Sequence, residues 1–188
     1  MNFFKLVLTV SLILFVVNSF SQYSSNKYTI AAGVAVPVNT FGTTNKTGVA
    51  MEFNYERLTN SAWSFVAGLG LDIFRGGDDY KVTEGPVTSY YYGNTANIGW
   101  LQTGVRFYPL KSLYLGASIG YAGIAGCAND TLHFRNCDNS SGGWLHSIGI
   151  GYKYKRFGFV SEYKNISRKK GGDFEFLDFR ISYLLRRD

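Results

Sequence analysis

The chain has 188 residues, a length typical of one domain, and contains 22 glycines, 17% aromatic residues and 17% charged residues. Three prolines and 46% hydrophobic residues exclude a disordered or collagen-like chain, and two cysteines exclude a disulfide-rich scaffold or a four-thiolate metal site. The net charge of +6 is modest and no nucleic-acid-binding motif accompanies it, so we expect no nucleic-acid partner.

Residues 1–21 are predicted to be a cleaved secretory signal peptide. An apolar run follows Lys5, and Ser19 and Ser21 stand at the small-residue positions of the cleavage site. The apolar run is too short for a membrane anchor, which needs about 20 residues to cross the hydrocarbon layer. Because no later stretch is long and apolar enough for a spanning helix, residues 22–188 are expected to be either soluble or a membrane β-barrel.

From residue 28 onward, large apolar side chains recur at every second position, the period of a strand with two different faces. In the first such segment Ile30 and Val34 alternate with Ala31 and Gly33. Eight segments follow this pattern, each near the length of about 9–11 residues that a tilted membrane strand needs. They are residues 28–36, 48–55, 63–73, 100–107, 113–121, 144–153, 157–164 and 177–185.

Short and long connections alternate between the predicted strands. Short turns are expected at 58–62, 109–112 and 155–156. Long loops are expected at 37–46, 75–92, 123–143 and 165–173. Outer-membrane barrels have this organisation, with short turns in the periplasm and long loops outside the cell.

The chemistry of the two strand faces distinguishes a membrane barrel from a soluble lipocalin-like barrel, which alternates in the same way. A soluble barrel would hide the large apolar face and show water a face rich in Lys, Glu and Thr. Here the second face is mostly Gly, Ala and Ser, so we expect Phe53, Leu101 and Ile181 to contact lipid. The sequence therefore predicts an all-β, eight-stranded antiparallel up-and-down transmembrane β-barrel.

Seven charged residues within the strands share the small-residue face. A Lys or Arg on the lipid face near the bilayer centre would cost about 2–4 kcal/mol, whereas opposite charges inside a barrel can pair. We expect an ion-pair network that fills the lumen, formed by Glu52, Asp72, Arg106, Lys153, Glu162, Asp178 and Arg180. The functional alternative is a polar track for protons or a small solute, because glycines in two strands leave internal space.

Residues 100–109, 113–121 and 177–185 resemble strands of the small eight-stranded outer-membrane proteins of Gram-negative bacteria, the OmpA transmembrane-domain and OmpX-like group. The resemblance is one of architecture and patterning. It implies residence in the outer membrane of a Gram-negative bacterium, in contact with membrane lipid and lipopolysaccharide. Barrels of that group commonly finish on an aromatic residue, whereas here charged residues follow Leu185 and Tyr183 is the nearest aromatic side chain.

Two features of the outer loops are candidate sites. Cys127 and Cys137 lie in the same long loop, and because the cell surface is oxidising we expect a disulfide that orders this loop. A metal site formed by these thiols and His133 lacks a recognisable ligand motif, so no metal or cofactor is expected. Arg168, Lys169 and Lys170 form a basic cluster that is either a solvated loop or a contact for lipopolysaccharide phosphates or another anionic partner.

The expected function is a structural or interaction role through the long outer loops, without catalysis and with a further envelope protein as an additional partner. The alternatives are a narrow pore or transporter for a small solute, and a lipid A-modifying enzyme. For the enzyme, His146 lies near the outer end of its strand, but a deacylase pattern needs a serine where Ile148 stands. We therefore assign His146 to the membrane-surface girdle and predict no catalytic residue.

Overall fold

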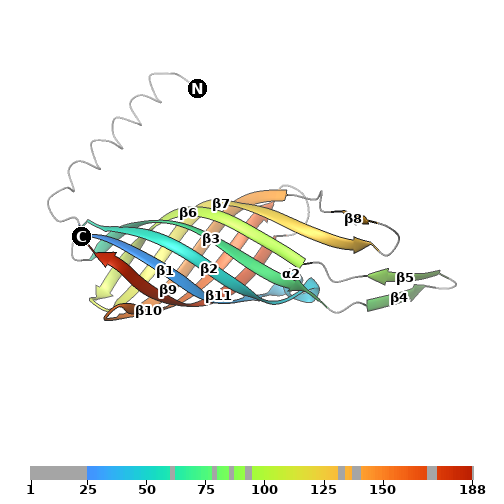
Figure 1. Cartoon of the computed structure of the whole chain (residues 1–188), viewed down its shortest axis with the longest axis horizontal. Helices are drawn as coiled ribbons and strands as arrows, with labels where there is room; N and C mark the ends of the chain where they lie inside the picture. Colours follow the sequence, from blue (N-terminus) through green and yellow to red (C-terminus); the bar gives the residue numbers. More distant parts are fainter. Residues whose placement is uncertain are drawn as a thin grey trace, which may run out of the picture.

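The computed structural model describes residues 25–59, 62–77, 80–84, 87–91, 95–130, 134–136, 141–168 and 173–187. Its main element is a closed antiparallel barrel in which each strand pairs with its neighbours along the chain and β1 closes the ring against β11 (Figure 1). The eight barrel strands are β1 (Asn26–Pro37), β2 (Asn45–Leu58), β3 (Trp63–Gly76), β6 (Thr95–Leu110), β7 (Leu113–Asp130), β9 (Ser141–Tyr154), β10 (Phe157–Arg168) and β11 (Phe174–Arg187). The predicted eight-stranded antiparallel barrel is confirmed.

Several strands extend further than the sequence predicts, mainly toward the end that carries the long loops. Strand β7 continues past residue 121 to Asp130, and β6 begins at Thr95. In this part of β7 the inward residues Ala122 and Ile124 alternate with the outward Gly123 and Ala125, which are both small. The contrast between the two faces is therefore weak, and the alternation cannot be recognised by side-chain size.

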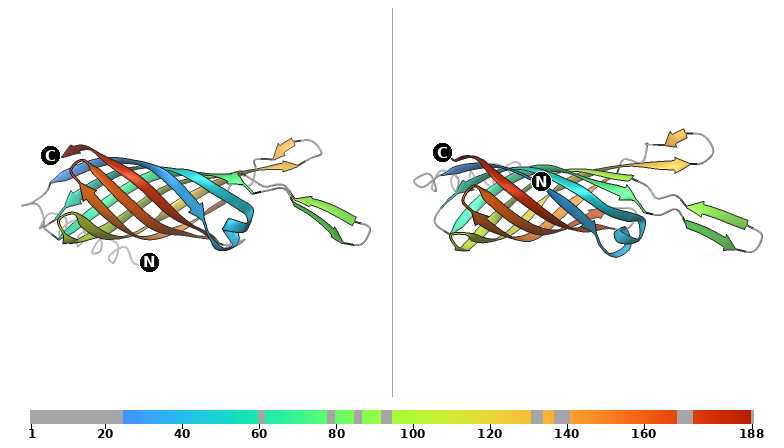
Figure 2. Two further views of the ribbon diagram at one scale, coloured as in Figure 1. Left: turned by 90° about the horizontal axis from the view of Figure 1, so that it is seen from below. Right: turned by 60° about the horizontal axis from the view of Figure 1, so that its bottom comes forward.

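Four shorter elements lie in the segments predicted to be long loops. They are the helix α2 (Asn39–Thr44), the hairpin strands β4 (Tyr80–Glu84) and β5 (Val87–Tyr91), and β8 (Phe134–Asn136), which pairs with β7. Figures 1 and 2 show α2 at one end of the barrel, with the β4–β5 hairpin and β8 extending beyond that end. We call this the long-loop end.

The three short connections gather at the opposite end, where β11 also finishes (Figure 1), and we call this the short-turn end. The three predicted short connections are confirmed. The predicted long loop 165–173 is wrong in its bounds, because β10 continues to Arg168 and β11 begins at Phe174, which leaves only residues 169–173 between them. Each turn accepts a backbone hydrogen bond from an adjacent strand. The N–H of Tyr108 donates to the carbonyl oxygen of Ala62 at 2.7 Å, that of Lys153 donates to the carbonyl oxygen of Ser112 at 2.6 Å, and that of Leu184 donates to the carbonyl oxygen of Arg156 at 2.7 Å. These bonds fix the positions of the turns.

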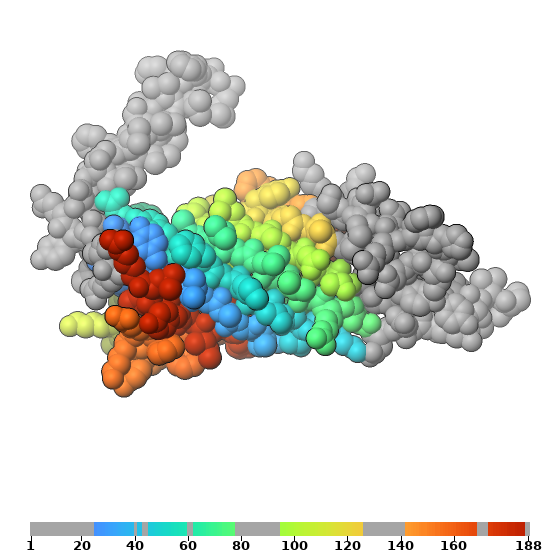
Figure 3. Space-filling view, in the orientation of Figure 1, coloured from blue at the N-terminus to red at the C-terminus, as the bar shows by residue number. Residues whose placement is uncertain are grey.

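The large apolar side chains of the barrel strands point outward, as the sequence predicts. Leu101 is 64% exposed and Ile181 56%, whereas their neighbours in the chain, Trp100 and Arg180, are 4% and 3% exposed. The space-filling view shows the strands β11, β1, β2 and β3 as oblique bands over one face of this surface (Figure 3). A barrel with this sidedness presents an apolar exterior and encloses its polar side chains, which is the reverse of a soluble lipocalin-like barrel.

Aromatic side chains pair at the ends of the strands on the outer surface. At the short-turn end the ring centroids of Tyr28–Tyr55, Trp63–Phe107 and Phe157–Tyr183 are 5.4, 4.9 and 5.3 Å apart. Toward the long-loop end Tyr121 and Trp144 meet edge to face at 6.1 Å. Aromatic residues in these two zones are typical of side chains that lie at the two surfaces of a bilayer.

The predicted signal peptide, residues 1–21, lies outside the described residues. In the described part of the chain, no helix is long and apolar enough to cross a membrane.

Candidate functional site

An apolar plug closes the long-loop end of the lumen. Pro37 ends β1, and the backbone N–H of Val38 then donates to Glu175 of β11 at 2.9 Å, which holds the start of α2 over the barrel. The helix inserts Phe41, 3% exposed, edge to face against Phe74 and Phe174, with ring centroids 4.9 and 4.5 Å away. Below this ring cluster lie the buried side chains of Ile98, Leu145, Ile166 and Phe176.

Directly beneath the plug, Lys164 connects two carboxylates. Its ammonium nitrogen lies 2.7 Å from Asp178 and 3.5 Å from Asp72, and all three side chains are fully buried. The same nitrogen lies 3.7 Å from the ring centroid of Trp100, whose indole N–H donates to Asp72 at 2.7 Å. A buried charge is tolerated only when it is paired, so this arrangement joins β3, β6, β10 and β11 at one level of the barrel.

The middle of the lumen is organised around Arg180. Its guanidinium group forms salt bridges with Glu52 of β2 and Glu162 of β10, and lies 3.4 Å from Asp178. The hydroxyl of Ser147 donates to Glu162 at 2.6 Å. These contacts join Arg180 to the Lys164 level through Asp178, and we call the combined set the upper cluster.

Near the short-turn end a second set of contacts, the lower cluster, surrounds Glu56. This fully buried carboxylate is 2.9 Å from Arg106 and 2.8 Å from Lys153, and it accepts hydrogen bonds from the hydroxyls of Ser64 and Tyr108. The Arg106 guanidinium also lies over the ring of Tyr114, which lines the lumen. The Glu56 carboxylate therefore forms salt bridges with two cationic side chains.

All seven charged residues predicted to face the lumen do so, and the structure divides them between the two clusters. Glu52, Asp72, Glu162, Asp178 and Arg180 lie in the upper cluster, and Arg106 and Lys153 lie in the lower one. Sequence reasoning missed the residue that completes each cluster. Glu56 continues the inward alternation of Glu52 and lies just past the predicted end of its strand. Lys164 follows Glu162 on the same face.

Little space is left between these side chains. The described residues enclose an internal void of about 20 Å³ beside Gln102, Arg106, Tyr114 and Glu162, on the order of one water molecule. The glycines that suggested internal space are Gly116, Gly120, Gly149 and Gly151. A Cβ on Gly151 would overlap the Tyr114 ring, and one on Gly120 or Gly149 would meet the backbone of the adjacent strand, whereas one on Gly116 would have its nearest neighbour at 3.6 Å. Within the described residues, the lumen between the apolar plug and the lower cluster is packed rather than open.

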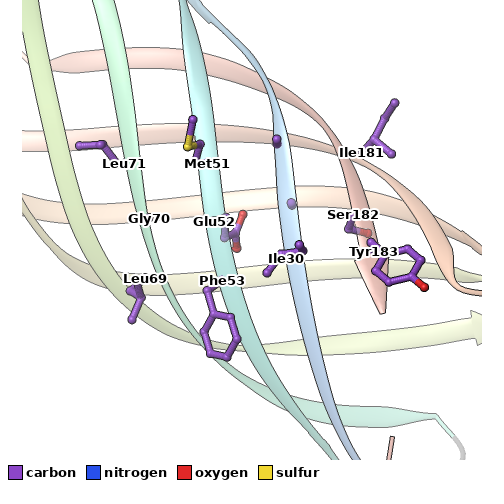
Figure 4. A pocket seen from close by; sticks show the side chains of 12 residues that line it. Ile30, Met51, Glu52, Phe53, Leu69, Gly70, Leu71, Ile181, Ser182 and Tyr183 are labelled. Carbon is purple, nitrogen blue, oxygen red and sulfur yellow. The ribbon is translucent and has the colours of Figure 1, made fainter. Parts of the chain in front are cut away.

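The outer surface carries a shallow apolar hollow of about 560 Å³ over β1, β2, β3 and β11 (Figure 4). It arises at Ala32, whose methyl group lies between the longer side chains of Met51 and Ile181 on the neighbouring strands. The figure shows Phe53 and Leu69 continuing its apolar wall. Its chemistry matches the rest of the outer surface.

The candidate residues of the outer loops are described only in part. Cys137, Lys169 and Lys170 lie outside the described residues, as does the side chain of Cys127, so the expected disulfide remains a prediction. Arg168 ends β10, and its guanidinium carbon lies 4.1 Å from the ring centroid of Phe174. Within the described residues, no group of three or more His, Cys, Asp or Glu side chains is arranged to hold a metal ion.

His146 lies on the outer surface of β9, opposite Ile119 and Asn165 on the adjacent strands. The described part of the chain shows no hydrogen bond between His146 and a serine, and Ser147 points into the lumen, where it donates to Glu162. The pairing of histidine and serine that a lipid A deacylase requires is not formed by these residues.

No protein-family model matches the sequence, and no curated protein matches it. The structure is similar to Ail, the attachment invasion locus protein of Yersinia pestis, solved in complex with the heparin analogue sucrose octasulfate. The TM-score is 0.62 at 9% sequence identity, and the match covers 89% of this chain and 100% of Ail. It is also similar to neisserial surface protein A, with a TM-score of 0.51, 12% identity and coverage of 84% and 94%.

OprG from Pseudomonas aeruginosa is a further similar structure, with a TM-score of 0.51, 11% identity and coverage of 87% of this chain and 98% of OprG. At such identities the likeness is one of fold. The expected resemblance to small eight-stranded outer-membrane proteins is confirmed at that level, and the chain has the fold of an outer-membrane β-barrel.

Proposed function

We propose that this protein is a sealed outer-membrane β-barrel of a Gram-negative bacterium, exported by its signal peptide, whose outer loops bind an anionic partner. The apolar exterior between two aromatic zones supports insertion into a bilayer. A closed ring also leaves no unpaired strand edge in hydrocarbon. On this proposal the short-turn end faces the periplasm and the long-loop end faces outward.

The observation that carries the interaction role is the packed lumen. Phe41 plugs one end, and the contacts of Lys164 and Glu56 fill the levels below it. An eight-stranded barrel filled in this way supports an interaction role better than conduction of a solute. The surface left for a partner is then the long-loop end, where the β4–β5 hairpin extends beyond the barrel (Figure 2).

The basic segment Arg168–Lys169–Lys170 supports an anionic partner, because Lys and Arg are the preferred donors to phosphate and sulfate oxygens. Lipopolysaccharide phosphates have the required chemistry and lie in the same membrane leaflet. The structurally similar protein Ail was solved with a sulfated polyanion, so heparin is a suitable probe.

The test uses intact cells that express the protein, because only the outer loops are then accessible. Fluorescent heparin binding is compared among the wild type, the variant R168Q/K169Q/K170Q, and a control variant K111Q/K155Q/R156Q at the short-turn end. We expect the loop variant to bind about fivefold less heparin, because three charges of the site are lost, and the control to match the wild type. Equal binding by the two variants would contradict the proposal.

The proposed role includes no catalytic step. The separate test is the profile of intact lipid A from cells expressing the wild type or His146→Ala. We expect the two profiles to be identical to that of cells lacking the protein, and a change in acylation that depends on His146 would contradict this part of the proposal.

A further inference from the structure

The short-turn end of the barrel contains a second hollow, about 260 Å³ in volume, which opens at the mouth of the lumen. Its walls come from β1, from two short turns, and from the ends of β9 and β11. Five of the lining residues are cationic: Lys27, Lys111, Lys153, Lys155 and Arg156. None of the lining residues, all of which are described, is acidic, so the hollow concentrates positive charge.

Hydroxyl groups accompany these cations. Thr29 and Ser182 line the hollow from the adjacent strands β1 and β11, and Ser112 lines it from the turn between β6 and β7. A hydroxyl group can donate to an anion without adding charge. The combination of ammonium, guanidinium and hydroxyl donors matches an oxyanion with several acceptor oxygens, such as a phosphate.

The backbone holds the rim of the hollow in place. The N–H of Lys153 donates to Ser112 across the gap between two turns, and the N–H of Leu184 donates to Arg156 at 2.7 Å. Lys155 adopts a left-handed backbone conformation with φ of 54°, which closes the two-residue turn tightly. The backbone from which the cationic side chains project is therefore held in place by the fold, so the backbone at this rim need not be ordered on binding.

Three cations of this rim, Lys153, Lys155 and Arg156, contact a single carboxylate between them, that of Glu56, so their positive charge is in excess. Lys153 shares the single carboxylate of Glu56 with Arg106. Lys155 lies 5.4 Å from the ring centroid of Tyr154, and Arg156 donates to the hydroxyl of Tyr183 at 3.4 Å. Aromatic rings and a hydroxyl orient these cations without neutralising them, which leaves their charge available to an anion.

We propose that this hollow is a binding site for a phosphate group at the short-turn end of the barrel. The phosphate can belong to an anionic phospholipid of the adjacent leaflet or to a soluble phosphate, and the two sources present the same oxyanion. The lipid source rests on the membrane insertion proposed above, whereas binding of inorganic phosphate does not. This site lies at the opposite end of the barrel from the basic cluster of the outer loops.

The test measures binding of inorganic phosphate to the folded barrel in nanodiscs of phosphatidylcholine. Phosphate is titrated against chloride at constant ionic strength, and the amide chemical shifts of Thr29, Ser112 and Ser182 are followed by NMR. The site variant is K111Q/K155Q, which removes two cations of the rim. The control variant is R57Q/R186Q, which removes two cations at the same end that do not line the hollow.

We expect saturable shifts at these three amides in the wild type and the control, and a dissociation constant about tenfold higher in the site variant. The experiment is repeated with phosphatidylglycerol in the nanodiscs. If the lipid headgroup occupies the site, the apparent dissociation constant for phosphate rises; if it does not change, soluble phosphate is the source. Shifts that are absent, or that weaken equally in both variants, would overturn the proposal.

Discussion

The ammonium nitrogen of Lys164 lies 3.7 Å from the ring centroid of Trp100, and both side chains contact the carboxylate of Asp72. This contact marks the level at which the apolar plug of the lumen gives way to charged side chains. Three residues from three strands thus satisfy one another where no solvent can do so. Their mutual dependence makes the upper cluster sensitive to loss of any member.

Replacing Lys164 with methionine keeps the volume of the side chain but removes its charge. Asp72 and Asp178 then lose their shared cation in a buried position, and breaking such a pair costs about 3–5 kcal/mol. We expect a decrease of this size in the free energy of unfolding, measured by urea denaturation of the detergent-folded barrel with tryptophan fluorescence. Lys46→Met, at an exposed position, is the control and is expected to change the value by less than about 0.5 kcal/mol. Equal effects of the two substitutions would contradict the assigned role of Lys164.

The lower cluster predicts energetic coupling between Glu56 and Lys153. Glu56→Gln leaves Arg106 and Lys153 as neighbouring, partly buried cations without their shared carboxylate, so we expect a loss of about 1–3 kcal/mol in the free energy of unfolding. Lys153→Met in the same chain removes one of these cations and is expected to recover part of the loss. A double-mutant cycle should give a coupling free energy above about 1 kcal/mol. Additive effects would show that the 2.8 Å contact contributes nothing specific.

The packing around Gly70 predicts that a larger residue there lowers the stability of the barrel by steric overlap rather than by loss of an ion pair. A Cβ at this position would overlap the ring of Trp100 and lie 2.6 Å from the carbonyl oxygen of Met51. Gly70→Ala therefore displaces Trp100 from Asp72, and overpacking of this kind costs about 1–3 kcal/mol. Gly99, adjacent to Trp100 in the chain, is the matched control because its Cβ would meet nothing within 4 Å. Urea denaturation of the two variants should differ accordingly, and equal stabilities would contradict the packing described for Trp100.

Phe41→Ala is expected to release α2 without opening a pore. The ring of Phe41 contacts Phe74 and Phe174, so its loss should speed amide hydrogen exchange at Gly42, whose N–H donates to Val38 at 3.1 Å. The two ion clusters still block the lumen, and the conductance of a planar bilayer should stay at baseline. A steady conductance in this variant alone would show that the plug, and not the charged side chains, seals the barrel.

The fold was predictable because one physical rule acts on every strand. A side chain such as Leu101 or Ile181 must face the apolar surroundings, and its neighbours must then face the lumen, so strand positions and sidedness follow from alternation. The rule weakens where the outward face carries small residues, as at Gly123 and Ala125. It does not apply to α2, since a six-residue helix has too few residues to show a period.

The composition of the lumen was predictable to a smaller extent. Alternation places Asp178 and Arg180 inside, but it does not say which strands meet at the same height, because that depends on the stagger of the closed barrel. Glu56 and Arg106 are 50 residues apart and meet only through this register. The aromatic plug around Phe41 could not be predicted for the same reason, since it depends on a loop folding back into the barrel mouth.

The most direct test of the barrel's sidedness uses spin labels in a lipid bilayer. Single cysteines are introduced at Leu101, Gln102, Ile148 and Ser147 in a chain whose two native cysteines are replaced by serine, and collision rates with oxygen and with a water-soluble nickel complex are measured. We expect labels at Leu101 and Ile148 to collide mainly with oxygen, which concentrates in the acyl chains, and labels at Gln102 and Ser147 to be shielded from it. Preferential oxygen access at Gln102 and Ser147 would contradict the membrane barrel.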